Sequence, residues 1–218
     1  QSNAGAVILS EDNFGSYLGN ALIGKNPHLM YAKASKVFME LRSPKADSYI
    51  SKLAEIHNSA SMGDCSTINP FVTISEDVVV ASDVSIGSSS FLGKGVKIGL
   101  GTYIHPNVSI YEGTEIGSNC IIHSGTVIGS DGLGFAKDGK NWYKIEHLGK
   151  VIIGDNVEIG SNTSIDRGSV GDTKVNDNVK IDNQVHLAHN VEIGEGTAIA
   201  ARSAVAGSSK IGRYCTLA

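Results

Sequence analysis

The chain has 218 residues, of which 41% are hydrophobic and 18% charged, and its formal net charge is −4 at pH 7. We therefore expect a soluble, mildly acidic protein without the basic excess that nucleic acid or an anionic membrane surface would attract. No apolar run approaches the roughly 18 residues of a transmembrane helix.

The three cysteines, Cys65, Cys120 and Cys215, are far apart in the sequence and form no CxxC pair. An odd count without metal-ligand spacing or a signal-peptide pattern favours reduced thiols, as in the cytoplasm. The composition is otherwise unusual in having 26 glycines and only 6% aromatic residues.

Residues 5–44 lack the repeat that follows. Residues 1–4, "QSNA", look like the remnant of a cleaved tag. Residues 5–50 predict a small remnant of an N-terminal α/β domain, too short to bury a core of its own. It has a strand in "GAVILSE" and a helix in "NPHLMYAKASKVFMEL", with Asn26 as N-cap and Pro27 at the first helical position. "SPKAD" should end the helix, whose apolar face would consist of Met30, Ala34, Val37, Phe38 and Leu41.

A six-residue period dominates residues 51–218. From Ile56 to Ile128, every sixth residue is aliphatic, and the period resumes over 153–165 and 175–217, which makes 24 hexads in all. The residue two positions before each aliphatic is small or β-branched, as expected when alternate side chains of a short strand point inward. Gly, Asn and Asp between the strands tolerate tight turns. A short strand and a turn in every hexad predict an all-β parallel β-helix.

The hexads resemble those of the hexapeptide acyltransferases, a resemblance that implies a left-handed β-helix with three hexads per triangular coil. The 24 hexads then make about eight coils. Two interruptions, at 129–150 and 166–174, must be excursions that leave the coils.

The histidines are the main candidates for chemistry, because a β-helix is only a scaffold. His105 and His123 are 18 residues apart and should stack on neighbouring coils, but no third metal ligand is at a fitting position, so we expect no metal. His147 lies in the long excursion near Trp142. His186 should face outward from a strand.

His189 follows the inward Leu187 by two residues and should lie at a corner of the β-helix. One coil further along the chain, the equivalent position is Gly207. One coil earlier, across the short excursion, it is Arg167, within "DRG" (Asp166 to Gly168). A histidine base below a free glycine amide suits acyl transfer: the imidazole deprotonates a nucleophile and the amide N–H stabilises the oxyanion. A solvated corner histidine is the alternative.

Longer motifs extend the resemblance. "GSDGLGFAKDGKNWYKIEHLGKVIIGDNVEIGSNTSIDRGSVGDT", "IDNQVHLAHNVEIGEGTAIA" and "AGSSKIGRYC" are similar to the UDP-3-O-acylglucosamine N-acyltransferases of lipid A synthesis, from about Gly5 to Ala218. That family implies a homotrimer with active sites between neighbouring β-helices, a 3-hydroxyacyl chain on the phosphopantetheine of acyl carrier protein as donor, and the 2-amine of UDP-3-O-acylglucosamine as acceptor. No bound cofactor is implied. The family's general base falls on His189 and its oxyanion amide on Gly207.

Two carboxylates are candidates to orient His189. Asp182, in "KIDNQ", is one hexad earlier and thus on another side of the β-helix, so a contact would have to come from a neighbouring chain. Asp166 is nearer by stacking. Either could instead only cap a turn. The excursion at 129–150 could form the wall of the acyl or pantetheine channel, or it could serve only to pack the trimer.

The chain departs from the family's pattern at both ends. We expect the chain to lack the uracil-binding positions of the family's N-terminal domain, as well as further coils, a second active-site histidine and a C-terminal helical extension. We therefore expect a chain truncated at both ends.

Three alternatives remain open. One is an O-acyltransferase acting on another UDP-sugar, although such chains usually start directly in the β-helix. Another is a γ-type carbonic anhydrase, which needs three converging histidines. The third is a purely structural trimer.

Overall fold

A computed structural model describes residues 4–15, 17–42 and 48–218. The chain divides into two compact units, 1–46 and 47–218, and each is described by itself. Residues 1–3 of the predicted tag and the predicted helix-ending segment at 43–47 lie outside the described residues.

The N-terminal unit is a two-stranded parallel sheet with helices. Its elements are β1 (Val7–Leu9), α1 (Glu11–Phe14), β2 (Ala21–Ile23) and α2 (Pro27–Arg42). The predicted N-cap is confirmed, because the Asn26 side-chain oxygen accepts a hydrogen bond from the Leu29 amide at 3.0 Å. The predicted apolar face is largely exposed, with Phe38 63% and Leu41 75% accessible. The small N-terminal unit therefore buries little of the apolar face of α2.

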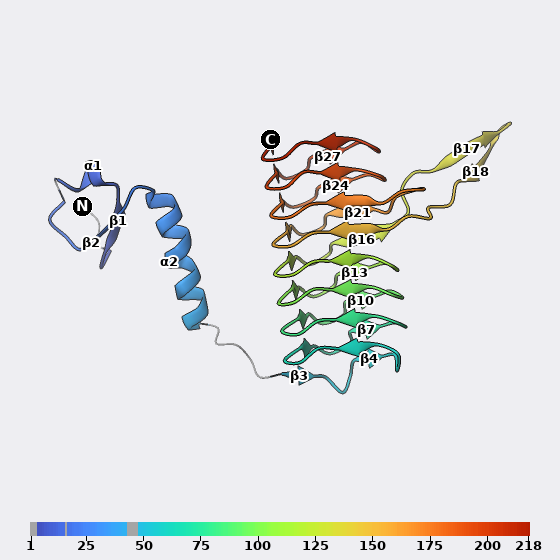
Figure 1. Cartoon of the computed structure of the whole chain (residues 1–218), viewed down its shortest axis with the longest axis horizontal. Coiled ribbons are helices and arrows are strands. Elements are labelled where there is room, and N and C mark those ends of the chain that lie inside the picture. Colours follow the sequence, from blue (N-terminus) through green and yellow to red (C-terminus); the bar gives the residue numbers. More distant parts are fainter. Residues whose placement is uncertain (1–3, 16, 43–47) are drawn as a thin grey trace. The chain divides into compact units, whose positions relative to one another are not determined.

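The second unit is the predicted parallel β-helix, built from three sheets whose strands stack coil upon coil (Figure 1). The first sheet contains β4 (Glu55–Ile56), β7 (Thr73–Ile74), β10 (Phe91–Leu92), β13 (Ser109–Ile110), β16 (Val127–Ser130), β21 (Ser164–Asp166), β24 (His186–Leu187) and β27 (Ala204–Val205). The second contains β5 (Ser61–Met62), β8 (Val79–Val80), β11 (Lys97–Ile98), β14 (Glu115–Ile116), β19 (Val151–Ile153), β22 (Thr173–Val175), β25 (Glu192–Ile193) and β28 (Lys210–Ile211). The third contains β3 (Tyr49–Ile50), β6 (Thr67–Ile68), β9 (Ser85–Ile86), β12 (Tyr103–Ile104), β15 (Ile121–Ile122), β20 (Glu158–Ile159), β23 (Lys180–Ile181), β26 (Ala198–Ile199) and β29 (Thr216–Leu217).

The hexad determines both the core and the corners. The aliphatic residue of each strand points inward, and most of these side chains are buried, as Ile110 and Leu187 illustrate. Three residues later the backbone takes a positive φ, for example at Asn107 (60°) and Asn190 (60°). Asn and Gly are the residues that adopt this left-handed conformation most readily, which explains their spacing through the sequence.

The β-helix begins one hexad earlier than the sequence analysis predicted. Tyr49–Ile50 forms β3 and pairs in parallel with Thr67–Ile68 of β6. Ile50 is six residues before Ile56 and keeps the period, but it stands next to the aperiodic N-terminal piece. The boundary between the two units is therefore at 46/47 instead of 50/51.

Both predicted excursions leave the β-helix at the same edge. The first leaves after β16 and returns to β19, and it carries the antiparallel hairpin of β17 (Phe135–Asp138) and β18 (Asn141–Lys144). The hairpin projects away from the coils (Figure 1). The second excursion connects β21 to β22. We call the edge between the sheet of β24 and the sheet of β25 the loop-bearing edge.

Candidate active site

The loop-bearing edge brings together most of the residues singled out from the sequence. Strands β16, β21, β24 and β27 are consecutive in one sheet, and their turns therefore stack along this edge. The two excursions start in the first two turns, His189 is in the third, and Gly207 is in the fourth. Four successive coils thus supply the long loop, the "DRG" segment, an imidazole and a glycine amide at one place.

Gly207 lies against the His189 ring, as the hexad count predicted. A Cβ atom added at Gly207 would lie 2.8 Å from both Nε2 and Cε1 of His189. The next amide, that of Ser208, donates a hydrogen bond to the His189 carbonyl at 2.8 Å, which ties the two turns together. Only glycine fits above the ring at this distance, so the Gly207 backbone is exposed to whatever approaches the imidazole.

Asn190 determines which nitrogen of His189 carries the proton. Its side-chain oxygen is 3.1 Å from His189 Nδ1 and accepts hydrogen bonds from the Ser169 amide and hydroxyl. The Asn190 side-chain nitrogen donates to the Gly171 carbonyl at 3.0 Å, which fixes the orientation of the amide. Because an amide oxygen only accepts, His189 Nδ1 must be the donor. In the neutral ring, Nε2 on the Gly207 side is therefore the free base.

Asp166 is a buried carboxylate, only 6% exposed. Its oxygens accept a hydrogen bond from the Ser130 hydroxyl at 3.2 Å and lie 3.5 Å from His186 Nε2. Burial raises the pKa of the Asp166 carboxyl, and the nearby His186, Ser130, His147 and His189 oppose that rise. Asp166 thus contacts His186 directly, and we find no hydrogen bond from it to His189. Asp166, predicted as a candidate partner of His189, instead lies beside the His186 ring, because the strand register pairs Ser164 with His186.

Asp182 is on a different edge from His189. It follows β23, whose sheet contains neither β24 nor β25. Its carboxylate accepts hydrogen bonds from the Asn183 amide at 2.7 Å and from the Asn183 side chain at 3.0 Å. Within this chain, Asp182 caps its own turn, as the simpler sequence interpretation had it.

His147 is the residue of this site that the sequence analysis did not assign. Its ring packs edge-on against His189, with ring centroids 5.7 Å apart and planes at 73°. It is buried, although it lies in the excursion outside the coils. No periodicity places a residue within an excursion, so the sequence carried no signal for this contact beyond the histidine itself.

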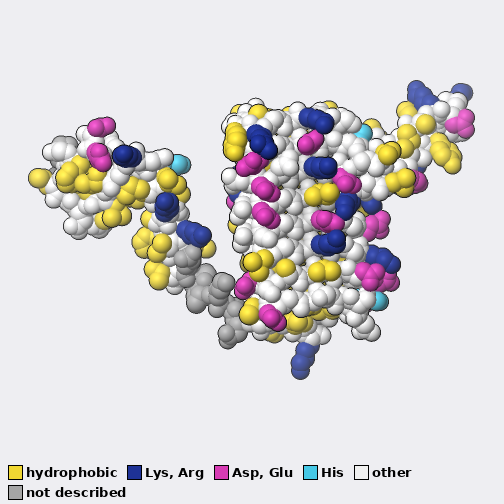
Figure 2. Space-filling view, in the orientation of Figure 1, with side chains coloured by type: hydrophobic (Ala, Val, Ile, Leu, Met, Phe, Trp, Pro, Cys, Tyr) yellow, Lys and Arg dark blue, Asp and Glu magenta, His cyan; other side chains and the backbone are white. Residues whose placement is uncertain are grey.

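The hairpin of β17 and β18 belongs to the excursion that was predicted as a possible wall of the acyl channel, and it carries apolar side chains. Leu133, Phe135 and Trp142 line a hollow of about 430 Å³. Figure 2 shows apolar side chains gathered on the projecting hairpin, with basic and acidic side chains at its tip.

His105 and His123 stack as expected, with centroids 4.6 Å apart, at an edge other than that of His189. His123 also contacts Glu158 at 3.2 Å. Across residues 4–15, 17–42 and 48–218, no group of three or more His, Cys, Asp or Glu side chains could hold a metal ion.

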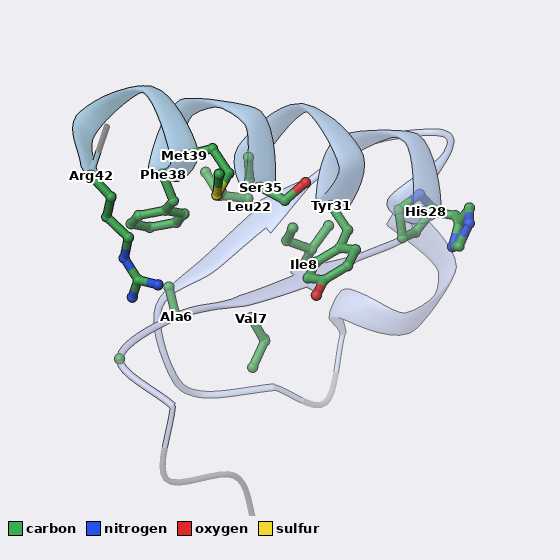
Figure 3. Close-up of a pocket in the computed structure, with 13 residues that line it drawn as sticks. Ala6, Val7, Ile8, Leu22, His28, Tyr31, Ser35, Phe38, Met39 and Arg42 are labelled. Atoms are coloured by element: carbon green, nitrogen blue, oxygen red, sulfur yellow. The ribbon is translucent and has the colours of Figure 1, made fainter. Parts of the chain in front are cut away.

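The N-terminal unit has a hollow of its own, of about 1180 Å³. It lies between α2 and β1, and its lining includes Ile8, Tyr31 and Phe38 with Arg42 at one end (Figure 3). The lining is mostly apolar.

The sequence and fold of the chain are similar to those of known hexapeptide-repeat proteins. Residues 95–130 and 172–207 match the model of the bacterial transferase hexapeptide (six repeats). The UDP-3-O-acylglucosamine N-acyltransferase of Saccharophagus degradans is 46% identical, over 81% of this chain and 51% of its own length. That of Pseudomonas entomophila is 41% identical, over 81% of this chain and 50% of its own length. The chain is thus similar to these N-acyltransferases over about four fifths of its own length. It spans about half the length of the curated relatives that it matches.

A solved structure supports the fold. The UDP-N-acetylglucosamine acyltransferase of Arabidopsis is 26% identical to this chain, with a TM-score of 0.67 over 76% of this chain and 57% of that one. The predicted β-helix of about eight coils and the resemblance to the N-acyltransferases are both confirmed. No described helix is long and apolar enough to cross a membrane.

Proposed function

We propose that this protein is an N-acyltransferase of lipid A synthesis. It transfers a 3-hydroxyacyl chain from acyl carrier protein to the 2-amine of UDP-3-O-acylglucosamine. One observation carries the proposal: the base nitrogen of His189 lies against the backbone of Gly207 at the edge that also bears both excursions. The curated relatives, which bear the name of this activity, support the choice of substrate class.

The residues of the loop-bearing edge supply the chemistry of thioester aminolysis. As the substrate amine attacks the thioester carbonyl, His189 Nε2 accepts a proton from the nitrogen. The Gly207 amide donates a hydrogen bond to the oxyanion of the tetrahedral intermediate. The intermediate collapses by breaking the carbon–sulfur bond, and the proton held on His189 passes to the departing thiolate. The products are the amide and the free phosphopantetheine thiol of the carrier protein.

Two neighbours support the imidazole as its charge changes. Asn190 accepts a hydrogen bond from Nδ1, so in the neutral ring Nε2 is the nitrogen that lacks a proton. The buried Asp166 lies close enough for His189 to affect its ionisation. Asp166 is therefore the buried acidic group nearest to the place where His189 takes up a proton during the reaction.

The assembly is part of the proposal. We propose a homotrimer that works in the cytoplasm, with the site between neighbouring β-helices. Within one chain, Asp182 lies on the wrong edge to contact His189. A role for Asp182 in orienting His189 therefore requires the Asp182-bearing edge of a neighbouring copy to face the loop-bearing edge.

The alternative within the same class is an O-acyltransferase on a UDP-sugar. The solved structure from Arabidopsis is named a UDP-N-acetylglucosamine acyltransferase, so the assay described below includes this alternative. The relatives at 46% and 41% identity favour the N-acyltransferase. The two activities differ in the bond formed, which is an amide in one case and an ester in the other.

A mass-spectrometric assay tests the proposal directly. The protein is incubated with 3-hydroxyacyl carrier proteins and either UDP-3-O-acylglucosamine or UDP-N-acetylglucosamine. We expect amide product from the first acceptor, and we expect His189→Ala to lower its rate by at least about 100-fold. His123→Ala, on another edge, is the matched control and should retain the rate. Ester product alone would support the O-acyltransferase, and absence of amide product would reject the proposal.

A further inference from the structure

His147 is the only buried histidine of the seven, all of which lie in described parts of the chain. Neither of its ring nitrogens has a hydrogen-bond partner among the described residues. Buried polar atoms in native proteins are almost always paired, so an unpaired pair of nitrogens calls for an explanation. Hydrogen bonds therefore do not account for the burial of His147, which leaves its ring contacts.

The backbone on both sides of His147 is firmly held. The Ile145 amide donates to the Gly134 carbonyl at 2.8 Å, and the Leu148 amide donates to the Ser169 carbonyl at 2.8 Å. The Gly149 carbonyl accepts from Arg167 Nε at 2.7 Å. His147 thus extends from a segment anchored to the rest of the first excursion and to the second.

The ring of His147 has little freedom where it lies. A Cβ atom added at Gly134 would come within 2.6 Å of its Cε1, so the opposite leg of the excursion closes over one side of the ring. His189 lies against it edge to face. The nearby Asp131 carboxylate forms an ion pair with Lys144 and is not a hydrogen-bond partner of His147.

His189 itself is held by one side-chain hydrogen bond, that from Nδ1 to Asn190. A single bond at one corner of a ring leaves the ring free to tilt about that corner. A tilt would move Nε2 away from Gly207. The edge-to-face contact with His147 restricts this motion from the side of the first excursion.

We propose that His147 is a positioning residue for His189. Its ring holds the base in the orientation that directs Nε2 toward Gly207, and the two excursions exist in part to present the two imidazoles to each other. The proposal rests on the proposed acyl transfer for its catalytic consequence. The orientation of the His189 ring can be measured separately from activity.

The kinetic test compares two substitutions. His147→Gln keeps a polar side chain but removes the ring, and we expect kcat to fall about tenfold while KM for both substrates stays within about twofold. His147→Phe restores an aromatic ring and should recover kcat to within about threefold of the wild type. His105→Gln removes a ring from the other histidine stack, away from the loop-bearing edge, and should leave kcat unchanged.

The structural test uses nuclear magnetic resonance of histidine-labelled protein. The His189 Cε1 proton should shift in His147→Gln, because the ring current of His147 is lost, and should stay near its wild-type position in His147→Phe. An unmoved His189 signal in His147→Gln, or a kcat in His147→Phe as low as that in His147→Gln, would overturn the proposal. If the wild type makes no amide, the proposed function fails, and the resonance shifts still show whether the His147 ring packs against His189.

Discussion

Gly207 and His189 are in contact across two coils: the added Cβ of any larger residue at Gly207 would lie 2.8 Å from the imidazole base nitrogen. This distance is shorter than real Cβ contacts allow, so the ring would have to move. The glycine is thus required for space at the site as well as for its amide.

Gly207→Ala should therefore disable the site while leaving the fold intact. The methyl group displaces the His189 ring from the amide, and we expect kcat to fall about 100-fold, comparable to the loss of a general base. The melting temperature should change little, since Ser208 and not Gly207 has the positive φ in this turn. Product formation in steady state checks the rate, and circular dichroism checks the fold.

Gly212→Ala is the matched control. An added Cβ there meets only the Cys215 sulfur at 3.6 Å, an ordinary contact. It should leave both kcat and melting temperature near the wild type. Equal losses in the two variants would mean that any methyl group in these last coils is harmful and that Gly207 has no special relation to His189.

Asn190→Gly tests the proton assignment of His189. Glycine accepts the positive φ of this position, so the substitution removes the side chain without straining the backbone. Without the oxygen that accepts from Nδ1, the proton can shift to Nε2 and block the base. We expect kcat to fall at least about tenfold, whereas Asn178→Gly, at the same turn position one β-helix edge away, should not affect it. An Asn190→Gly variant with wild-type kcat would contradict the tautomer argument.

The hexad made much of this site predictable. Counting in coils placed Gly207 next to His189 and Arg167 in the turn below, because parallel stacking in register converts an 18-residue step into spatial adjacency. The short excursion did not disturb the count, since it leaves and re-enters at one edge. Asn26 as the N-cap of α2 was predictable for a local reason, its fit to the first turn.

The rest depended on contacts that no period encodes. His147 reaches His189 through a loop whose path is set by hydrogen bonds to the second excursion. Asp166 contacts His186 because strand register, and not coil stacking alone, decides which side chain is beside it. In both cases the deciding interaction is between residues far apart in sequence. Ile50 differs from these two, because it keeps the period and was left out only because the segment before it is aperiodic.

Asp166→Asn should change how stability depends on pH. Burial raises the pKa of Asp166 in the folded state, so between its unfolded value, about 3.9, and the raised folded value the native protein binds more protons than the unfolded chain. The wild type therefore loses stability as pH rises through this window. The Asp166→Asn variant lacks this titrating group, so it does not lose stability in this way. Its free energy of unfolding minus that of the wild type should therefore rise with pH across this window and then level off. Each unit of pKa difference corresponds to about 1.4 kcal/mol.

Urea unfolding at a series of pH values from 3.5 to 7 measures this difference. Asp172→Asn is the control, because it removes a carboxylate from the second excursion for which we find no comparable burial. A difference between Asp166→Asn and the wild type that is flat across the series would contradict the raised pKa. A difference that falls with pH would mean that the interaction with His186 outweighs burial.

The hairpin offers a test of substrate contact. Leu133, Phe135 and Trp142 line one hollow, and an acyl chain buried there would gain roughly 0.8 kcal/mol per methylene. If the hairpin forms the wall of the acyl channel, Trp142→Ala should raise KM for long-chain acyl carrier proteins several-fold and leave short-chain donors and kcat nearly unchanged. Tyr143 is the next residue on β18, and successive side chains of a strand point to opposite faces. Tyr143→Ala should therefore have no chain-length effect. Equal effects of Trp142→Ala on all donors would point instead to a hairpin that packs against a neighbouring copy of the chain.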